Sequence, residues 1–159
     1  MIDNRLRRII AEADGFAVGT FLMSDSATSA AMMDAAGYDF LAIDRQHGVI
    51  DDATCLRLLA EIGRHGTAPI VRVPANRPED AMRALDHGAL GVIAPLIDDA
   101  AGAAILTAAC RFPPHGGRSF GPVRAGPVYG RGYLQAIDDQ VLAIAMIETR
   151  AGLDALDAI

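Results

Sequence analysis

The sequence contains no tryptophan, and aromatic residues make up only 5% of its 159 residues. Alanine, glycine and aliphatic side chains dominate instead, a composition that favours helices packed closely on a sheet over an aromatic-rich β-sandwich. Hydrophobic residues account for 52% of the chain, which is enough to bury one sizeable core. We therefore expect a single α/β domain over residues 1–159.

Three further shortages exclude other classes of protein. The chain has only two cysteines, Cys55 and Cys110, too few for the disulfide framework of a small secreted domain. A net charge of −6 without clustered Lys or Arg leaves no basic surface for nucleic acid. No apolar run approaches the ~20 residues that span a bilayer, and the charged residues 1–14 do not form a signal-peptide core. We expect a cytoplasmic protein without nucleic-acid or membrane partners.

Short apolar runs alternate with amphipathic stretches along the chain, which is the order that gives a parallel sheet with crossover helices. The predicted strands are 17–22, 40–44, 69–73, 91–95 and 141–148. The predicted helices are 26–36, 51–65, 78–87, 98–110 and 151–159, several of which open with Ser, Asp or Pro. Residues 111–132, rich in Gly and Pro, are predicted to form a long loop.

Two closures are available to such a chain, an open doubly wound sheet and a closed (β/α)₈ barrel. The first strand is not followed by the G-x-G-x-x-G fingerprint of a dinucleotide site. Polar residues instead recur where predicted strands end, namely Asp44 with His47, Arg72 and Glu148. Because a barrel gathers the carboxyl ends of its strands at one opening, this pattern favours the barrel.

Two of these polar residues suit chemistry at such an opening. His47 follows the strand 40–44 on a short loop, and an imidazole exchanges protons near neutral pH. Arg72 lies at the end of the apolar run PIVRV, where a guanidinium loses solvation unless it meets an anion. His47 is therefore either catalytic or an exposed loop residue, and Arg72 holds either a substrate anion or a neighbouring carboxylate.

The remaining candidates also have two interpretations each. Glu148 ends the most apolar predicted strand, where either a divalent cation or a salt bridge to Arg72 or Arg150 would explain a carboxylate. Asp86, near the end of the predicted helix 78–87, either orients His47 or simply occupies a helix end. Arg118 and Arg124 lie among glycines in a loop that either covers an anionic substrate or forms an arm between subunits.

Together these segments resemble the HpcH/HpaI aldolase family. Seven of them follow the order and spacing of that family and span nearly the whole chain: GTF at 19–21, AGYDF at 36–40, IDRQH at 43–47, PIVRV at 69–73, LDHGA at 85–89, RFPPHGGR at 111–118 and IET at 147–149.

The resemblance implies a (β/α)₈ barrel that reversibly cleaves a 4-hydroxy-2-oxo acid into pyruvate, or an analogue, and an aldehyde. It implies a divalent metal, Mg²⁺ or Mn²⁺ or a similar ion, with Glu148 as a ligand. By position, Arg72 would hold the keto or enolate oxygen, and His47, oriented by Asp86, would transfer the hydroxyl proton. Arg118 and Arg124 would contact substrate. Members of the family tend to be homo-oligomers with sites near subunit contacts.

The sequence departs from the family pattern at three places. Gln46 stands where the family commonly has Glu, and Met146 stands where it often has Gln. The second metal carboxylate of the family lies in a later Gly-Pro-x-Asp motif that this chain does not contain. We therefore expect a truncated, incomplete (β/α)₈ TIM barrel that lacks its C-terminal strands and is poorly active or inactive alone. Two other functions stay open: a CoA-ester lyase of the citrate/malyl lyase type, and a non-catalytic half-barrel that binds a partner.

Overall fold

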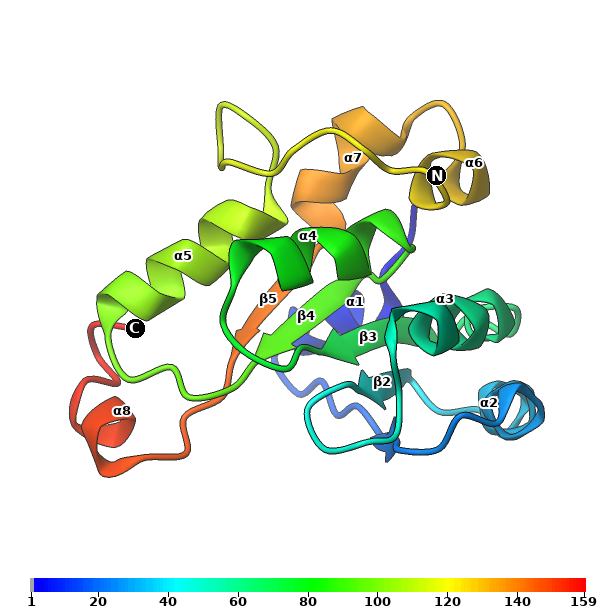
Figure 1. Ribbon diagram of the computed structural model, residues 1–159, viewed down its shortest axis with the longest axis horizontal. Coiled ribbons are helices and arrows are strands. Elements are labelled where there is room, and N and C mark those ends of the chain that lie inside the picture. Colours follow the sequence, from blue (N-terminus) through cyan, green and yellow to red (C-terminus); the bar gives the residue numbers. More distant parts are fainter. Residues whose placement is uncertain (1) are drawn as a thin grey trace.

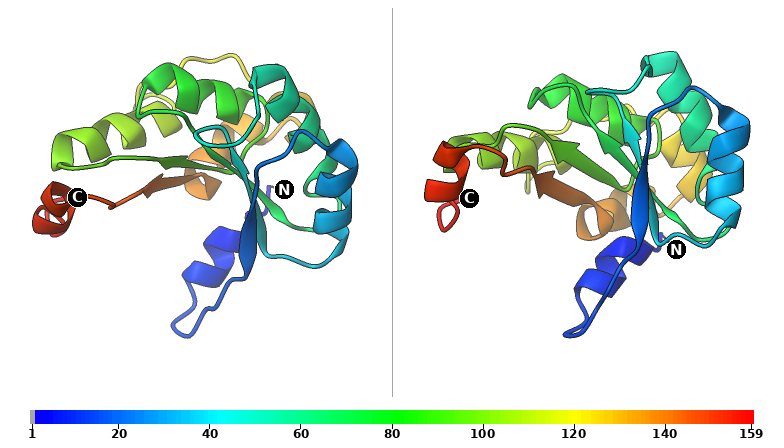
Figure 2. Two further views of the ribbon diagram at one scale, coloured as in Figure 1. Left: turned by 60° about the horizontal axis from the view of Figure 1, so that its bottom comes forward. Right: turned by 90° about the horizontal axis from the view of Figure 1, so that it is seen from below.

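The structure is a computed structural model that describes residues 2–159. It is an α/β fold whose five strands form one parallel sheet in the order of the chain (Figure 1). The strands are β1 (Gly19–Leu22), β2 (Phe40–Asp44), β3 (Ala68–Arg72), β4 (Gly91–Ala94) and β5 (Leu142–Ala145). The sheet is curved (Figure 2), and its sequential parallel order is that of a (β/α)₈ barrel wall.

Helices connect the strands, and their starts follow the capping residues expected from the sequence. Ser26 caps α2 (Ala27–Ala35), Asp51 caps α3 (Asp52–Glu61), and Pro78 occupies the first turn of α4 (Pro78–Asp86). The others are α1 (Arg5–Ile10), α5 (Ala100–Cys110), α6 (Ala125–Tyr129), α7 (Tyr133–Gln140) and α8 (Arg150–Asp154). No helix within residues 2–159 combines the length and the hydropathy needed to cross a bilayer.

Alternation along the strands gives the sheet two different faces. Leu41, Ile43 and Val71 point outward into a core that they share with helices α2 to α5. Ala42 and Ile70 point to the concave face and pack with Leu6 of α1. Helix α1 lies on this side of the sheet (Figure 2). Asp44 and Arg72 have the same parity as the concave residues, so their side chains lie on the inner side of the curve.

Three helices were not expected, and one strand and two helices end earlier than expected, since α3 ends at Glu61 and α8 at Asp154. Helices α6 and α7 interrupt the region after α5, so the expected long loop ends sooner, and α1 was not expected. The predicted strand 141–148 ends at Ala145, because β5 pairs only with β4 and that ladder ends with Ala94 opposite Ala145. Glu148 was expected to be the buried last residue of this strand. In the structure it lies beyond the strand and is exposed.

Candidate functional site

Asp44 and Arg72 form the centre of the polar edge of the concave face. They are register partners in the β2–β3 ladder. The Asp44 carboxylate accepts hydrogen bonds from Arg72 Nε at 2.9 Å and Nη2 at 2.5 Å, and from the backbone N–H groups of Gln46 and His47. Burial raises the pKa of Asp44, but these hydrogen bonds outweigh it and hold the pKa below its usual value. Asp44 is thus a charged anchor for Arg72.

Arg72 keeps one nitrogen without an oxygen partner among the described residues. Its Nη1 lies 3.8 Å from the sulfur of Met146, a weak acceptor, and the ring of Phe21 lies 4.7 Å from the guanidinium carbon. Hydrogen bonding to Asp44 raises the pKa of Arg72 despite partial burial, and the charge of Glu148 adds to this effect. The result is a fixed, permanently charged group with donor capacity left for an anion.

His47 and Glu148 lie at this same edge, which we call the carboxyl-end rim (Asp44, His47, Arg72 and Glu148). His47 is exposed in the turn that follows β2. Glu148 lies after β5 and accepts a hydrogen bond at Oε1 from the backbone N–H of Leu96 at 2.9 Å. The structure contains neither of the salt bridges considered for Glu148, since Arg72 pairs with Asp44 and Arg150 pairs with Asp154.

Asp86 lies away from this rim, and within residues 2–159 its carboxylate makes no hydrogen bond to His47, the residue that it was expected to orient. Asp86 ends α4 at the side of the sheet where strands begin, because α4 leads into the first residues of β4. Its carboxylate accepts a hydrogen bond from Arg118 Nη2 at 2.8 Å. A helix between two parallel strands runs opposite to them, so its last residue lies away from the carboxyl ends of those strands.

Arg118 is also placed away from the rim, as a buried structural residue. Its guanidinium donates to Asp86 and to the hydroxyl of Tyr133, and it lies 4.5 Å above the ring of Phe112. The residue is 2% exposed. The expectation that Arg118 contacts substrate is therefore not met at the rim, because its charge is used to join α4 to α7.

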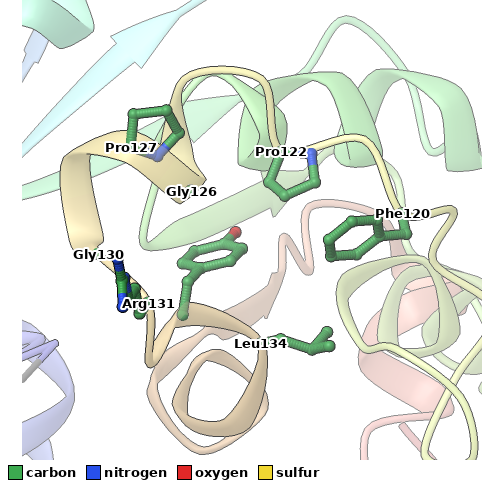
Figure 3. Close-up of a pocket in the computed structure, with 8 residues that line it drawn as sticks. Phe120, Pro122, Gly126, Pro127, Gly130, Arg131 and Leu134 are labelled. Carbon is green, nitrogen blue, oxygen red and sulfur yellow. The ribbon is translucent and has the colours of Figure 1, made fainter.

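A groove of about 410 Å³ lies beside these residues, between α6, α7 and the segment before them (Figure 3). Phe120, Pro122, Pro127 and Leu134 give it a mostly apolar lining. None of the rim residues borders it. The groove therefore contributes nothing to the polar site at the rim.

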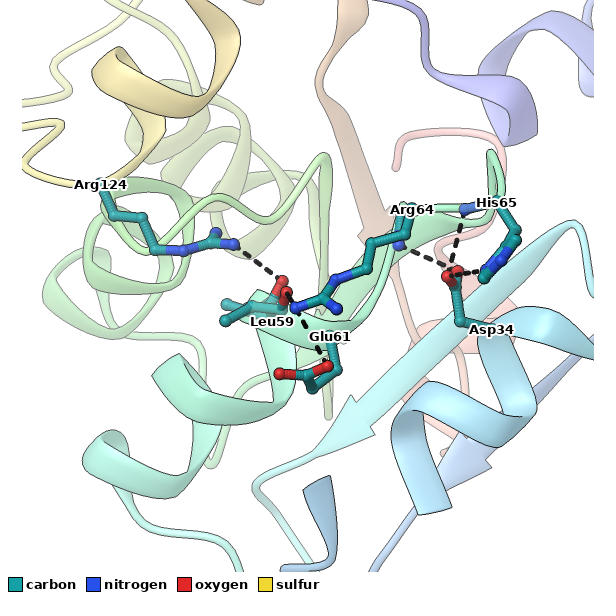
Figure 4. Close-up of polar contacts among 8 residues, drawn as sticks. Asp34, Leu59, Glu61, Arg64, His65 and Arg124 are labelled. Atoms are coloured by element: carbon teal, nitrogen blue, oxygen red, sulfur yellow. Dashed lines mark hydrogen bonds and ion pairs between the residues drawn. The ribbon is translucent and has the colours of Figure 1, made fainter. Parts of the chain in front are cut away.

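Arg124 fastens the same region to the helix ends around it. Its Nη1 donates to the carbonyl of His87 at 2.6 Å. Its Nη2 donates to the carbonyl of Leu59 at 3.0 Å, and Figure 4 shows this second contact. The last carbonyl groups of a helix lack partners within the helix, and a guanidinium supplies the missing donors. Arg124 was expected to contact substrate. Its guanidinium instead donates to backbone carbonyl groups and is not available to a substrate at the rim.

Comparison with known proteins identifies the fold's family. The family model described as HpcH/HpaI aldolase/citrate lyase matches residues 17–159. The chain belongs to the HpcH/HpaI aldolase/citrate lyase family. A crystal structure of a member of this family from Burkholderia cenocepacia aligns with a TM-score of 0.86 at 30% identity, covering 99% of this chain and 64% of that one.

Two curated relatives of this HpcH/HpaI chain are named as aldolases. A hydroxypyruvate/pyruvate aldolase of Rhizorhabdus wittichii is 43% identical over 77% of this chain and 49% of its own length. A 2-dehydro-3,6-dideoxy-6-sulfogluconate aldolase of Pseudomonas putida is 39% identical over 89% of this chain and 56% of its own length. The chain thus spans about half the length of these relatives.

The divalent metal that the family resemblance implies does not find a complete set of ligands in this HpcH/HpaI chain. Within residues 2–159, no three His, Cys, Asp or Glu side chains converge. Arg72 engages both oxygens of Asp44, and Leu96 engages one oxygen of Glu148. The one unengaged carboxylate oxygen of Glu148 is not by itself a complete set of ligands for such an ion.

Two parts of the site were not expected from the sequence: the ion pair of Asp44 with Arg72 and the ring of Phe21 beside it. Asp44 was noted only as a polar strand end, although an aspartate and an arginine that end neighbouring parallel strands can meet in register. Phe21 was also predictable, because side chains alternate between the two faces along β1 and this alternation places Phe21 on the concave face. The backbone contribution of Leu96 left no signal in the sequence.

Proposed function

We propose that this chain carries the oxo-acid-binding part of a carbon–carbon lyase that cleaves a 4-hydroxy-2-oxo acid into pyruvate, or an analogue, and an aldehyde. The observation that carries this proposal is Arg72, held by Asp44 while Nη1 faces only the sulfur of Met146. A guanidinium in this position can donate a hydrogen bond to the 2-keto oxygen and retain it as the oxygen becomes an enolate.

His47 supplies the second role. It removes the proton from the 4-hydroxyl group as the bond between C3 and C4 breaks, and the bonding electrons move to the enolate oxygen held by Arg72. The hydroxyl carbon leaves as the aldehyde. Protonation of C3 then gives pyruvate, so that the reaction adds and removes no net proton. The exposure of His47 leaves its imidazole accessible to a substrate at the rim.

Glu148 is proposed as one carboxylate ligand of a divalent cation such as Mg²⁺ or Mn²⁺. Since a single available carboxylate oxygen does not hold such an ion in the usual coordination, we expect the 159-residue chain to turn over slowly or not at all by itself. Measuring pyruvate release from a 4-hydroxy-2-oxo acid, with and without EDTA, tests this expectation. Fast, EDTA-sensitive turnover by this chain would contradict it.

Binding is tested separately from turnover. We expect pyruvate to bind the wild-type chain in ligand-observed NMR and to lose that binding in Arg72→Met. Arg72→Lys should bind more weakly than wild type, because a lysine cannot keep the two hydrogen bonds to Asp44 and reach the ligand as well. Arg131→Met, an exposed arginine at the apolar groove, is the control. Equal pyruvate binding by Arg72→Met and wild type would refute the proposed role of Arg72. In a separate assay, release of acetyl-CoA from malyl-CoA would favour a CoA-ester lyase.

We also propose that the protein acts as an oligomer or with its barrel completed by further strands. Strands β1 and β5 are the two edges of the described sheet. Phe16 and Phe21 leave large apolar surfaces exposed beside β1, at 83% and 44% exposure. Size-exclusion chromatography with light scattering, together with ANS fluorescence, tests this: a monomer that binds no ANS would be incompatible with it.

A further inference from the structure

The loop between β4 and α5 contains the one non-glycine residue within residues 2–159 that has a positive φ. Leu96 has φ of 55°, in the left-handed region that residues with a Cβ rarely adopt. Its side chain is 59% exposed, so burial of the leucine does not account for this conformation. Strained backbone of this kind persists only where surrounding contacts impose it, and it is enriched at functional sites.

The left-handed turn directs the backbone N–H of Leu96 at the rim. This N–H donates to Oε1 of Glu148 at 2.9 Å. Within residues 2–159 the second oxygen, Oε2, accepts no hydrogen bond from another residue. Glu148 therefore has one oxygen fixed by the backbone and one left for a ligand, although its side chain is otherwise exposed.

Contacts on the other side of Leu96 hold the loop in place. The N–H of Ile97 donates to the carbonyl of Met146 at 3.2 Å, and Thr149 Oγ1 donates to Asp98 Oδ1 at 2.5 Å. A Cβ at Gly152 would lie 2.7 Å from the carbonyl oxygen of Ile97, so only glycine permits this approach of α8 to the loop. The β4–α5 loop is thus docked on the segment that carries Glu148.

We propose that Leu96 is a positioning residue, whose left-handed backbone fixes Glu148 through one oxygen and keeps the other available at the rim beside Arg72. The inference rests on the proposed function only in placing the oxo acid at this rim. Leu96 acts through its N–H and its φ, and its side chain takes no part. A fixed carboxylate is better placed than one that must lose its rotational freedom at each binding event.

Two substitutions distinguish the effect of the Leu96 backbone conformation from the effect of the Leu96 side chain. Leu96→Ile keeps composition and size but adds a branch at Cβ, which makes the left-handed conformation a severe outlier. Leu96→Asn changes the side chain completely but tolerates the left-handed region. Leu153→Ile is the matched control, since Leu153 is 57% exposed and belongs to α8.

We expect Leu96→Ile to lose the hydrogen bond from the backbone N–H of residue 96 to Glu148, and Leu96→Asn to keep it. Hydrogen exchange measures this bond without turnover. The amide of residue 96 should be protected in wild type and in Leu96→Asn, and should exchange at least about tenfold faster in Leu96→Ile and Glu148→Ala.

The two measurements distinguish this inference from the proposed function. Equal pyruvate binding by wild type and Arg72→Met would count against the proposed function, while the exchange experiment would still decide the role of Leu96. Unchanged protection at residue 96 in Leu96→Ile would overturn the inference. Equal losses of protection at residue 96 in Leu96→Asn and Leu96→Ile would also overturn it, because they would assign the effect to the side chain.

Discussion

Asp44 and Arg72 are opposite one another in the β2–β3 register and form a two-point ion pair on the concave face of the sheet. The side chain of Asp44 is fully buried, and that of Arg72 is 13% exposed. Removing one partner of a buried pair leaves a desolvated charge without compensation. The pair therefore links the stability of the sheet to the geometry of the candidate site.

Asp44→Asn should lower the free energy of unfolding by about 3 kcal/mol, because Arg72 keeps its charge in a partly buried position. Urea denaturation measures the change. Asp80→Asn is the control, since Asp80 pairs with the exposed Arg77 on α4 and such surface pairs contribute less than about 1 kcal/mol. Equal stabilities of Asp44→Asn and Asp80→Asn would show that the buried pair does not stabilise the sheet.

His47→Asn should separate function from stability. Where the wild-type chain releases pyruvate at a measurable rate, we expect His47→Asn to lower that rate about 100-fold, as for loss of a proton-transfer group. The free energy of unfolding should change by less than about 0.5 kcal/mol, because the side chain is exposed. His115→Asn, at an exposed histidine paired with Asp138, should leave the rate unchanged. A His47→Asn protein with the wild-type rate would exclude His47 as the proton-transfer group.

Local patterns predicted the elements that local physics determines. The strand 40–44 and the caps Ser26 and Asp51 follow from apolar runs and from side-chain oxygens at helix starts, and the structure has them. Helix α7 was missed because its moderately polar sequence lies next to a Gly-rich and Pro-rich segment, and its burial depends on a distant contact of Tyr133 with Arg118.

The candidate site was predictable where it depends on strand ends and unpredictable where it depends on tertiary contacts. Arg72, His47 and Glu148 follow the strands that place them at one rim. Arg118 and Arg124 have the composition of anion-binding residues, but their partners are a carboxylate and carbonyl groups contributed by helices α3 and α4 or the residue after α4. Sequence spacing contains no information on which partner a long arginine side chain will reach.

Arg118→Leu should therefore affect stability and not pyruvate binding. Loss of the contacts with Asp86 and Tyr133 should lower the free energy of unfolding by about 2 kcal/mol, since Asp86 remains partly hydrated when unpaired. Pyruvate binding at Arg72 should be retained in the folded fraction, measured by ligand-observed NMR below the unfolding transition. Wild-type stability combined with lost pyruvate binding would return Arg118 to the substrate site.

Asp34 makes the stability of the chain depend on pH. Its fully buried carboxylate accepts hydrogen bonds from the N–H groups of Gly63 and His65 and contacts the His65 ring nitrogen at 2.9 Å (Figure 4). Burial raises the pKa of Asp34, but these hydrogen bonds and one involving Thr67 outweigh it, so the pKa lies below its usual value. The unfolded chain, with an ordinary pKa of about 3.9, therefore binds a proton first as the pH falls.

The contribution of Asp34 should be complete above about pH 5 and should disappear as the pH falls through the folded-state pKa. Asp34→Asn should lower the free energy of unfolding at pH 7 by about 1–3 kcal/mol and should flatten its decline below about pH 4. Urea denaturation at a series of pH values measures both effects, and Asp157→Asn, at an exposed carboxylate, should follow the wild-type curve. Some decline should persist in Asp34→Asn, because the lowered pKa of Asp44 acts with the same sign. If Asp34→Asn instead lost stability with the full wild-type slope, the hydrogen bonds to Asp34 would not be the source of the acid sensitivity.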